Sequence, residues 1–432
     1  MSLFRPTVFT KSENCPSEVP PTAGRRGTLS SEPPLFATLH EAIMDSVSSV
    51  RDSLPEQHRA HFETLRQEII DFTKAHGIPK ESLTKPAVLR EVTCKLSTSD
   101  LERLALLLEH FEYLIVKKEP WKNTEALEYG EKFYHLHEQY DSQVELLEEV
   151  GILKEGAITG IDGHEYPVPT LEQIASRLFE RRETLKTKHD QGFTKLLLVP
   201  FGMSLNALQE TFKQFLLKYK ESDSSFDLDT HDPLSTWEGY QGADIGDFPG
   251  LVYEPQSFDP KDHQGKTKME ILKKQEDNQD SFSGWTVHLF QPSHPSNPHS
   301  PGIALIPRKD KGTLQGNLIP RPPLEANKTP IEYLSIFQNA QDDENSPYHG
   351  ESGMTPEDWI TAFMIHLSET GKPPDNFTNN KESISYLTGA FFPFSVLVPN
   401  AYWDCGGRRA CLDGDELRLL VWDTGARSSV IV

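Results

Sequence analysis

The carboxyl-terminal residues 402–432 constrain what this chain can fold into more than any other segment. Half of the four cysteines and two of the six tryptophans lie here, and polar or charged residues stand between strand-like ends. This mixture is typical of a strand-and-loop scaffold that carries a recognition surface, although an irregular packed end can have the same composition. The pattern favours binding over catalysis, and it names no substrate.

Charge and length exclude several classes of protein. The chain has 432 residues and a formal net charge of -22, so phosphate backbones and anionic lipids repel it. No apolar run approaches the roughly 20 residues that span a bilayer, and the amino terminus lacks an apolar signal core. Four cysteines do not make a disulfide scaffold. We therefore expect a cytoplasmic protein that binds neither nucleic acid nor membranes.

The pattern of apolar residues divides the chain into four parts. Residues 1–33 are rich in Pro, Ser, Thr and Gly, which predicts a disordered tail. Residues 34–220 show helical periodicity, including one long helix from Thr124 to Val150, and hold a single short buried strand around Leu196–Val199. Residues 221–282 are acidic and turn-rich, which indicates a linker. Residues 283–432 mix strands and helices, so the predicted fold class is α+β.

Two helix starts in the last part are marked by capping signals. Thr329-Pro330 is followed by a glutamate at the third helical position, and Thr355-Pro356 is followed by Asp358 in the same place. The second helix continues with Trp359 and an apolar face, and Gly371 ends it. After this helix the sequence predicts only short strands and loops.

Residues 283–432 resemble a C-type-lectin-type fold. Thr355-Pro356-Glu357-Asp358-Trp359 is similar to the acid-plus-tryptophan helix start of the formylglycine-generating-enzyme branch of that fold. Gly425-Ala426-Arg427-Ser428-Ser429-Val430 is similar to its closing Gly-aromatic-Arg strand, with Ala426 in the aromatic position. The same layout resembles the variable proteins of diversity-generating retroelements. The helical half resembles uncharacterised proteins of small-genome bacteria, which implies no activity.

The resemblance implies a rigid platform whose variable residues lie near the carboxyl terminus, between fixed scaffold residues. Adenine mutation of Asn-type codons yields a restricted set of residues, and the positions from 404 to 423 that fall within this set are candidates. Trp403, Ala410, Leu412, Glu416 and Trp422 then form the scaffold. The candidate ligand-binding residues are Tyr402, Asp404, Cys405, Arg408, Arg409, Cys411, Asp413, Asp415, Arg418, Leu420 and Asp423.

The expected function is therefore a binding protein without catalytic residues or cofactor, whose ligand is a protein or a glycan. The arginines either receive an acidic partner by bidentate pairing or pair internally with Asp404, Asp413, Asp415 and Glu416.

Two alternatives remain open. A three-residue turn over Gly407–Arg409 would place Cys405 opposite Cys411, as in a copper-dependent oxidase of the formylglycine-generating type, since soft thiolates suit Cu(I). The five residues between these cysteines are one more than that family has. The second alternative is a structural protein that assembles, as a homo-oligomer, through the helical region.

Overall fold

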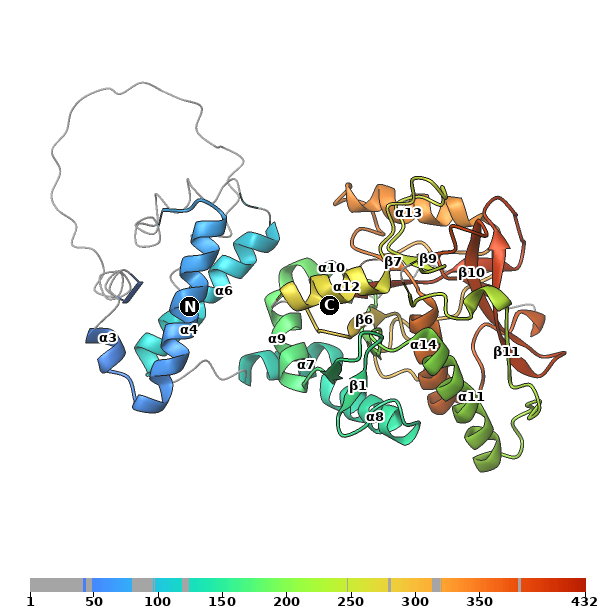
Figure 1. The fold of residues 1–432 in the computed structure, drawn as a ribbon, viewed down its shortest axis with the longest axis horizontal. Helices are drawn as coiled ribbons and strands as arrows, with labels where there is room; N and C mark the ends of the chain where they lie inside the picture. The colour runs from blue at the N-terminus through green and yellow to red at the C-terminus, as the bar shows by residue number, and fades with distance from the viewer. Residues whose placement is uncertain are drawn as a thin grey trace, which may run out of the picture. The chain divides into compact units, whose positions relative to one another are not determined.

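The computed structural model describes residues 42–43, 49–79, 96, 98–118, 124–246, 248–278, 281–312, 319, 321–379 and 382–432. They belong to two compact units, which divide between Glu125 and Ala126. The predicted α+β class is confirmed, since helices come first in the chain and sheets follow (Figure 1). The predicted tail of residues 1–33 lies outside the described residues.

The first unit is built from amphipathic helices. Its described helices are α3 (Ser49–Asp52), α4 (Glu56–Ala75) and α6 (Thr98–Lys117). The apolar stripes of α4 and α6 face each other, and the rings of Phe62 and Phe111 lie 5.1 Å apart between their centroids. Gly77 follows α4 with a φ of +63°, a conformation that glycine adopts without strain.

The second unit begins with further helices. They are α7 (Thr124–Tyr134), α8 (Leu136–Glu149), α9 (Leu171–Glu180), α10 (Arg182–Asp190) and α11 (Leu205–Ser222), and the short strands β1 (Ala157–Thr159) and β2 (Glu165–Pro167) pair before α9. The single helix predicted from Thr124 to Val150 is two helices. His135 interrupts it with a φ of +48°, and α8 starts at the buried Leu136.

A four-stranded antiparallel sheet crosses this unit. Its order is β3 (Lys195–Val199), β6 (Thr286–Phe290), β13 (Ser428–Ile431) and β7 (Ser352–Gly353). All five residues of β3 are buried, as the apolar run predicts. Its hydrogen-bonding partner β6 lies far along the chain. The helices that follow Ala126 therefore belong with the carboxyl-terminal sheets, and the predicted boundary at residue 220 does not coincide with the observed division.

A five-stranded sheet forms the carboxyl-terminal part of the unit. Its order is β12 (Thr424–Ala426), β8 (Ile384–Tyr386), β10 (Leu397–Asp404), β11 (Arg409–Glu416) and β4 (Leu234–Thr236). Strand β4 pairs in parallel with β11. Another small sheet joins β5 (Val252–Tyr253) to β9 (Ala390–Phe391).

Residues 221–282, predicted as a linker, are part of the second unit. They supply β4, β5, the short helix η2 (Glu238–Tyr240) and the helix α12 (Lys268–Asp277), and Tyr240 and Leu251 are fully buried. Some of the aspartates that suggested a linker make local turns, whereas Asp244 is buried and pairs with Lys268. Asp223 accepts a hydrogen bond from the backbone of Ser225, and Asp259 accepts one from the backbone of Lys261. Acidic composition here marks turns between packed segments.

Helix α14 (Pro356–Thr370) lies at the centre of the second unit. Both predicted caps are observed, because Thr355 and Asp358 form a capping box at α14, and Thr329 and Glu332 form one at α13 (Pro330–Gln341). Every α14 residue from Pro356 to Leu367 is buried. This helix packs against α11, which runs beside it in Figure 1, and against β3 and β10.

Candidate ligand-recognition surface

The hairpin of β10 and β11 has one face in the core and one face turned away from it. Cross-strand neighbours share a face, and the register pairs Trp403 with Ala410 and Ala401 with Leu412. These four side chains are buried in the main core, as expected for scaffold residues. The alternate pairs form the opposite face. They are Asp404 with Arg409, Tyr402 with Cys411, Asn400 with Asp413, and Val398 with Asp415. Part of this face is covered as well, because Asn400 is buried and Val398 belongs to a second apolar cluster.

Six of the predicted ligand residues therefore share that outward face. Asp413 is exposed, Cys411 is buried, and the other four are half-buried: Tyr402, Asp404, Arg409 and Asp415. Eight-residue strands are about 25 Å long at roughly 3.3 Å per residue. The face is thus an elongated strip between the turn at one end of the hairpin and the loop after β11 at the other.

The turn of the hairpin occupies residues 405–408. The Asp404 carboxylate accepts a hydrogen bond of 2.9 Å from the backbone of Gly406, and Arg408 has a φ of +54°. A side chain at Gly407 would place its Cβ 2.5 Å from Asp404 Oδ2, so the close approach requires glycine. These contacts fix a four-residue turn, one residue longer than predicted.

The longer turn separates the two cysteines. Cys405 lies in the turn and Cys411 lies opposite Tyr402, so the predicted pairing of Cys405 with Cys411 across the hairpin is wrong. Both are free thiols. Burial raises the pKa of the Cys411 thiol to about 11, with a smaller opposing effect from its hydrogen bond to Tyr402. The arrangement on which the copper alternative depended is not observed.

The two turn arginines pair with the segment that precedes β4. Arg408 Nη1 lies 3.6 Å from Asp227 Oδ1, and Arg409 Nη1 contacts Asp232 Oδ2. These partners differ from the hairpin carboxylates that the sequence suggested. Both pairs are open to water, where such interactions contribute roughly 0–1 kcal/mol. The guanidinium groups can therefore exchange these partners for a ligand carboxylate at little cost.

Burial shifts the pKa values of two side chains on the strip. It raises the pKa of Tyr402 above its ordinary value, and Cys411 adds to the effect. It also raises the pKa of Asp415, although a hydrogen bond from Asn400 opposes this. Tyr402 stacks edge-on against Phe377, with ring centroids 5.4 Å apart. The central tyrosine is thus a neutral, partly covered group, while the charged residues lie toward the ends.

The loop after β11 holds the remaining predicted residues. Arg418 and Leu420 are exposed, and Asp423 is half-buried with an ion pair of 3.5 Å to Arg308. Trp422, predicted as scaffold, is 62% exposed, because it stacks on the Arg308 guanidinium at 4.5 Å instead of entering the core. Other exposed apolar side chains at this end of the hairpin are Phe394, Val396, Leu419 and Leu420.

A buried ion pair holds the closing segment beneath the hairpin. Arg427 Nη2 donates a hydrogen bond of 2.6 Å to Asp375 Oδ1, and Trp359 Nε1 donates one of 2.8 Å to Asp375 Oδ2. The backbone carbonyl of Asp375 accepts from the backbone of Trp403 in β10. The closing arginine, the central helix α14 and the hairpin are therefore joined through one aspartate.

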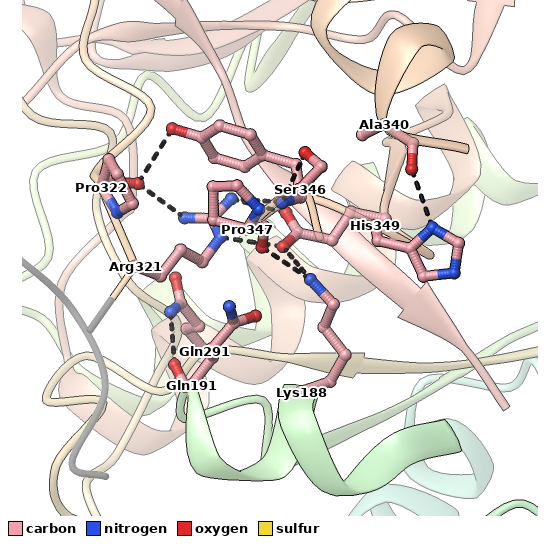
Figure 2. Close-up of polar contacts among 12 residues, drawn as sticks. Lys188, Gln191, Gln291, Arg321, Pro322, Ala340, Ser346, Pro347 and His349 are labelled. Atoms are coloured by element: carbon pink, nitrogen blue, oxygen red, sulfur yellow. Dashed lines mark hydrogen bonds and ion pairs between the residues drawn. The ribbon is translucent and has the colours of Figure 1, made fainter. Parts of the chain in front are cut away.

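The next residue, Ser428, joins a second buried network that includes Lys188 and Arg321, both labelled in Figure 2. Ser428 Oγ donates to Glu351 Oε2 at 2.6 Å, and the same carboxylate receives Arg321 Nη2 at 2.5 Å and Lys188 Nζ at 2.7 Å. The Arg321 guanidinium also lies 4.6 Å from the centroid of the Tyr348 ring. Sequence reasoning missed Asp375, Glu351 and Arg321, because nothing local indicates their distant partners.

One cluster among the described residues has metal-ligand side chains. Donor atoms of Asp162, His164 and Glu276 lie within 4.8 Å of one another. His164 Nδ1 lies 3.2 Å from Glu276 Oε1, and Tyr166 donates to Asp162 Oδ2 at 2.5 Å. His164 and Glu276 are exposed, and hydrogen bonding accounts for the cluster.

Comparison with known proteins adds no relative, since no family model, curated protein or solved structure matches the chain. Across the part of the chain that the structure describes, no helix is both long enough and apolar enough to span a bilayer.

Proposed function

We propose that this chain is a non-enzymatic binding protein that recognises a protein or glycan through the hairpin surface. This surface consists of the outward face of β10 and β11, the turn 405–408 and the loop 417–423. The proposal includes the expectation that its residues are exchangeable, as in the C-type-lectin-fold variable proteins that the sequence resembles. One observation carries it: on either side of the turn, at residues 401–404 and 409–413, side chains in the main core alternate with side chains on the opposite face.

The alternation matters because the two sets of residues have different energetic roles. Replacing a buried side chain such as Leu412 by Ala costs about 2–5 kcal/mol, whereas surface changes stay within about 0.5 kcal/mol. An exposed residue such as Asp413 can therefore change while the frame persists. The networks at Arg427 and Ser428 support the same separation, because they fix the closing segment from inside the unit.

The chemistry of the surface fits a polar macromolecular ligand. Arg408 and Arg418 are exposed donors, Asp404 and Asp413 supply acceptors, and the exposed ring of Trp422 supplies apolar area. Aromatic and arginine side chains dominate the energetics of protein interfaces. A strip about 25 Å long suits an extended contact.

Two matched libraries of the full chain test the separation of roles. The first varies the predicted ligand residues except the buried Cys411, and the second varies Ala401, Trp403, Ala410 and Leu412. We expect most members of the first library to fold and members selected against different target proteins to bind them specifically, whereas most members of the second library do not fold. Equal fractions of folded members, or no binder from the first library, would contradict the proposal.

A genomic observation tests natural variability directly. We expect a nearly identical non-coding copy of the stretch that encodes residues 400–432, close to a reverse-transcriptase gene and different mainly at adenines. Its absence from the source genome would refute the variable-protein part of the proposal and leave a binding protein with a fixed surface.

A further inference from the structure

A cavity of about 360 Å³ opens on the four-stranded sheet of the second unit, apart from the hairpin surface. Strands β6, β7 and β13, helices α12 and α13, and the amino-terminal end of α14 line it; Figure 1 labels most of these elements. Its volume is near the lower end of the range of roughly 300–1,000 Å³ that is usual for small-molecule sites. Glu254, Gln341 and Ile431 are exposed and form its rim.

Four residues that line this cavity each carry a buried polar atom without a hydrogen-bond partner among the described residues. These atoms are Thr286 Oγ1, His288 Nε2, Asp358 Oδ1 and Thr388 Oγ1. Asp358 and Thr388 are each 1% exposed, and His288 is 4% exposed. An unsatisfied buried polar atom costs about 1–3 kcal/mol. Four of them around one cavity indicate a place where a ligand completes the hydrogen bonds.

The sheet and the helix cap hold these groups in position. His288 Nδ1 lies 2.9 Å from Ser429 Oγ, so the hydroxyl fixes the imidazole ring. Asp358 uses its other oxygen, Oδ2, to accept from the backbone of Thr355 at 2.8 Å. His288 Nε2 and Asp358 Oδ1 are 3.2 Å apart, but they lack the alignment of a hydrogen bond. A ligand ammonium at Asp358 Oδ1 would therefore share that oxygen with His288 Nε2.

The charges around the cavity favour a cation. Its lining holds the carboxylates of Glu254, which pairs with Lys266 outside the lining, and of Asp358, and none of the described lining residues is a lysine or an arginine. Behind the lining residue Tyr253, the buried Lys268 pairs with both Asp244 at 2.6 Å and Glu357 at 2.8 Å. That cluster contributes one excess negative charge, and Asp358 adds another.

The remaining wall is apolar. Phe201, Phe337 and Leu334 are buried and line the cavity together with the ring of Tyr253. We propose that this cavity binds a small organic amine, with its ammonium group at Asp358 and its apolar, preferably aromatic, body against these side chains. The hydroxyl groups of Thr286 and Thr388 accept further hydrogen bonds from the same end of the ligand. This site is independent of the hairpin surface.

Calorimetric titration of the full chain tests the proposal with two probes of similar size. 2-Phenylethylamine carries the cation, and 3-phenylpropanoate carries an anion on a comparable body. We expect the amine to bind saturably at millimolar concentrations or below, with one molecule per chain, and the anion to bind at least about tenfold more weakly. Equal binding of both probes, or no saturable binding of the amine, would overturn the proposal.

Variants locate the site. Asp358→Asn keeps an oxygen for the helix cap and should weaken amine binding about tenfold or more. Asp413→Asn makes the same change on the hairpin surface and should leave the affinity unaltered. Thr388→Val removes an unpartnered hydroxyl without changing the shape, so it should weaken the amine while the protein stays folded by circular dichroism. Unchanged affinity in the folded Thr388→Val and Asp358→Asn variants would place the amine elsewhere and refute the assignment.

Discussion

Replacing Glu351 by Gln should unfold the second unit at a markedly lower temperature. The Glu351 carboxylate is fully buried, and it pairs with Arg321 and Lys188, whose side chains are only 2% and 6% exposed. Removing its charge leaves two cations in the interior without a counter-charge. Breaking a buried ion pair in this way costs about 3–5 kcal/mol.

The expected change in melting temperature follows from the size of the unit. Unfolding entropy near 60 °C is about 2.1 cal/mol/K per residue, which is about 0.6 kcal/mol/K for the unit from Ala126 to Val432. A loss of about 3–5 kcal/mol therefore lowers the midpoint by about 5–8 °C, which calorimetry or circular dichroism detects easily. Glu254→Gln is the matched control, because its pair with Lys266 is half exposed and contributes roughly 0–1 kcal/mol.

The pH dependence of the stability tests the same ion-pair network independently. Burial alone would raise the pKa of Glu351, but Arg321 and Lys188 outweigh it and lower that pKa below its ordinary 4.5. For Lys188, burial outweighs the attraction of Glu351 and lowers the pKa. Arg321 binds both carboxylate oxygens, with Nε 2.8 Å from Oε1 and Nη2 2.5 Å from Oε2. A lowered carboxyl pKa contributes stability above pH 4.5 that is lost as the pH falls through the folded value.

The wild type and Glu351→Gln should therefore differ most near neutral pH and converge in acid. A midpoint change no larger than that of Glu254→Gln at pH 7, or a difference that grows in acid, would refute this account of the buried network.

Three further predictions concern single side chains. Trp403→Ala should cost about 3–5 kcal/mol in denaturant unfolding because the indole is buried, whereas Trp422→Ala should cost less than about 1 kcal/mol; equal losses would contradict the observed exposure. Iodoacetamide should alkylate Cys405 well before Cys411 at pH 8, as followed by mass spectrometry, because burial raises the pKa of Cys411 to about 11; equal rates would show that the hairpin opens. Burial, with a smaller effect of Arg427, lowers the pKa of His366 to about 4 from 6.5, so protonation of the unfolded chain should remove up to about 3 kcal/mol of stability between pH 6.5 and 4, and His366→Gln should flatten that part of the profile.

Local signals in the sequence predicted local structure correctly. The caps at Thr329 and Thr355 depend on residues three positions apart, and both capping boxes are observed. The restricted set of codons assigns Trp403, Ala410 and Leu412 to the scaffold, and all three are buried, whereas Trp422, assigned in the same way, is exposed. The turn was less accessible to prediction, because its length depends on the Asp404 hydrogen bond and on the left-handed Arg408. Because of these two features, Cys405 lies in the turn and not in strand β10.

Long-range pairing explains what the sequence could not show. Strand β3 was recognisable from its apolar run, but its partner β6 is about 90 residues away, so its place in the carboxyl-terminal sheet was hidden. Lys188, Arg321 and Glu351 are likewise isolated in the sequence, and none has a neighbour that indicates burial. The cavity combines residues from 201 to 431, and among them Thr355 and Asp358 carried a local signal, as the cap of one helix.

The segment Arg427–Ser429 connects the two proposed sites. Arg427 holds Asp375, whose backbone supports Trp403 in the hairpin, while Ser429 holds His288 at the wall of the cavity. Ser428 between them is tied to Glu351. Side chains on the outward face of the hairpin make none of these three contacts. A change at Arg427 should therefore disturb the hairpin and a change at Ser429 the cavity, whereas a change on the outward face affects only the ligand contacts. This separation is the physical condition under which a recognition surface can vary while its frame stays constant.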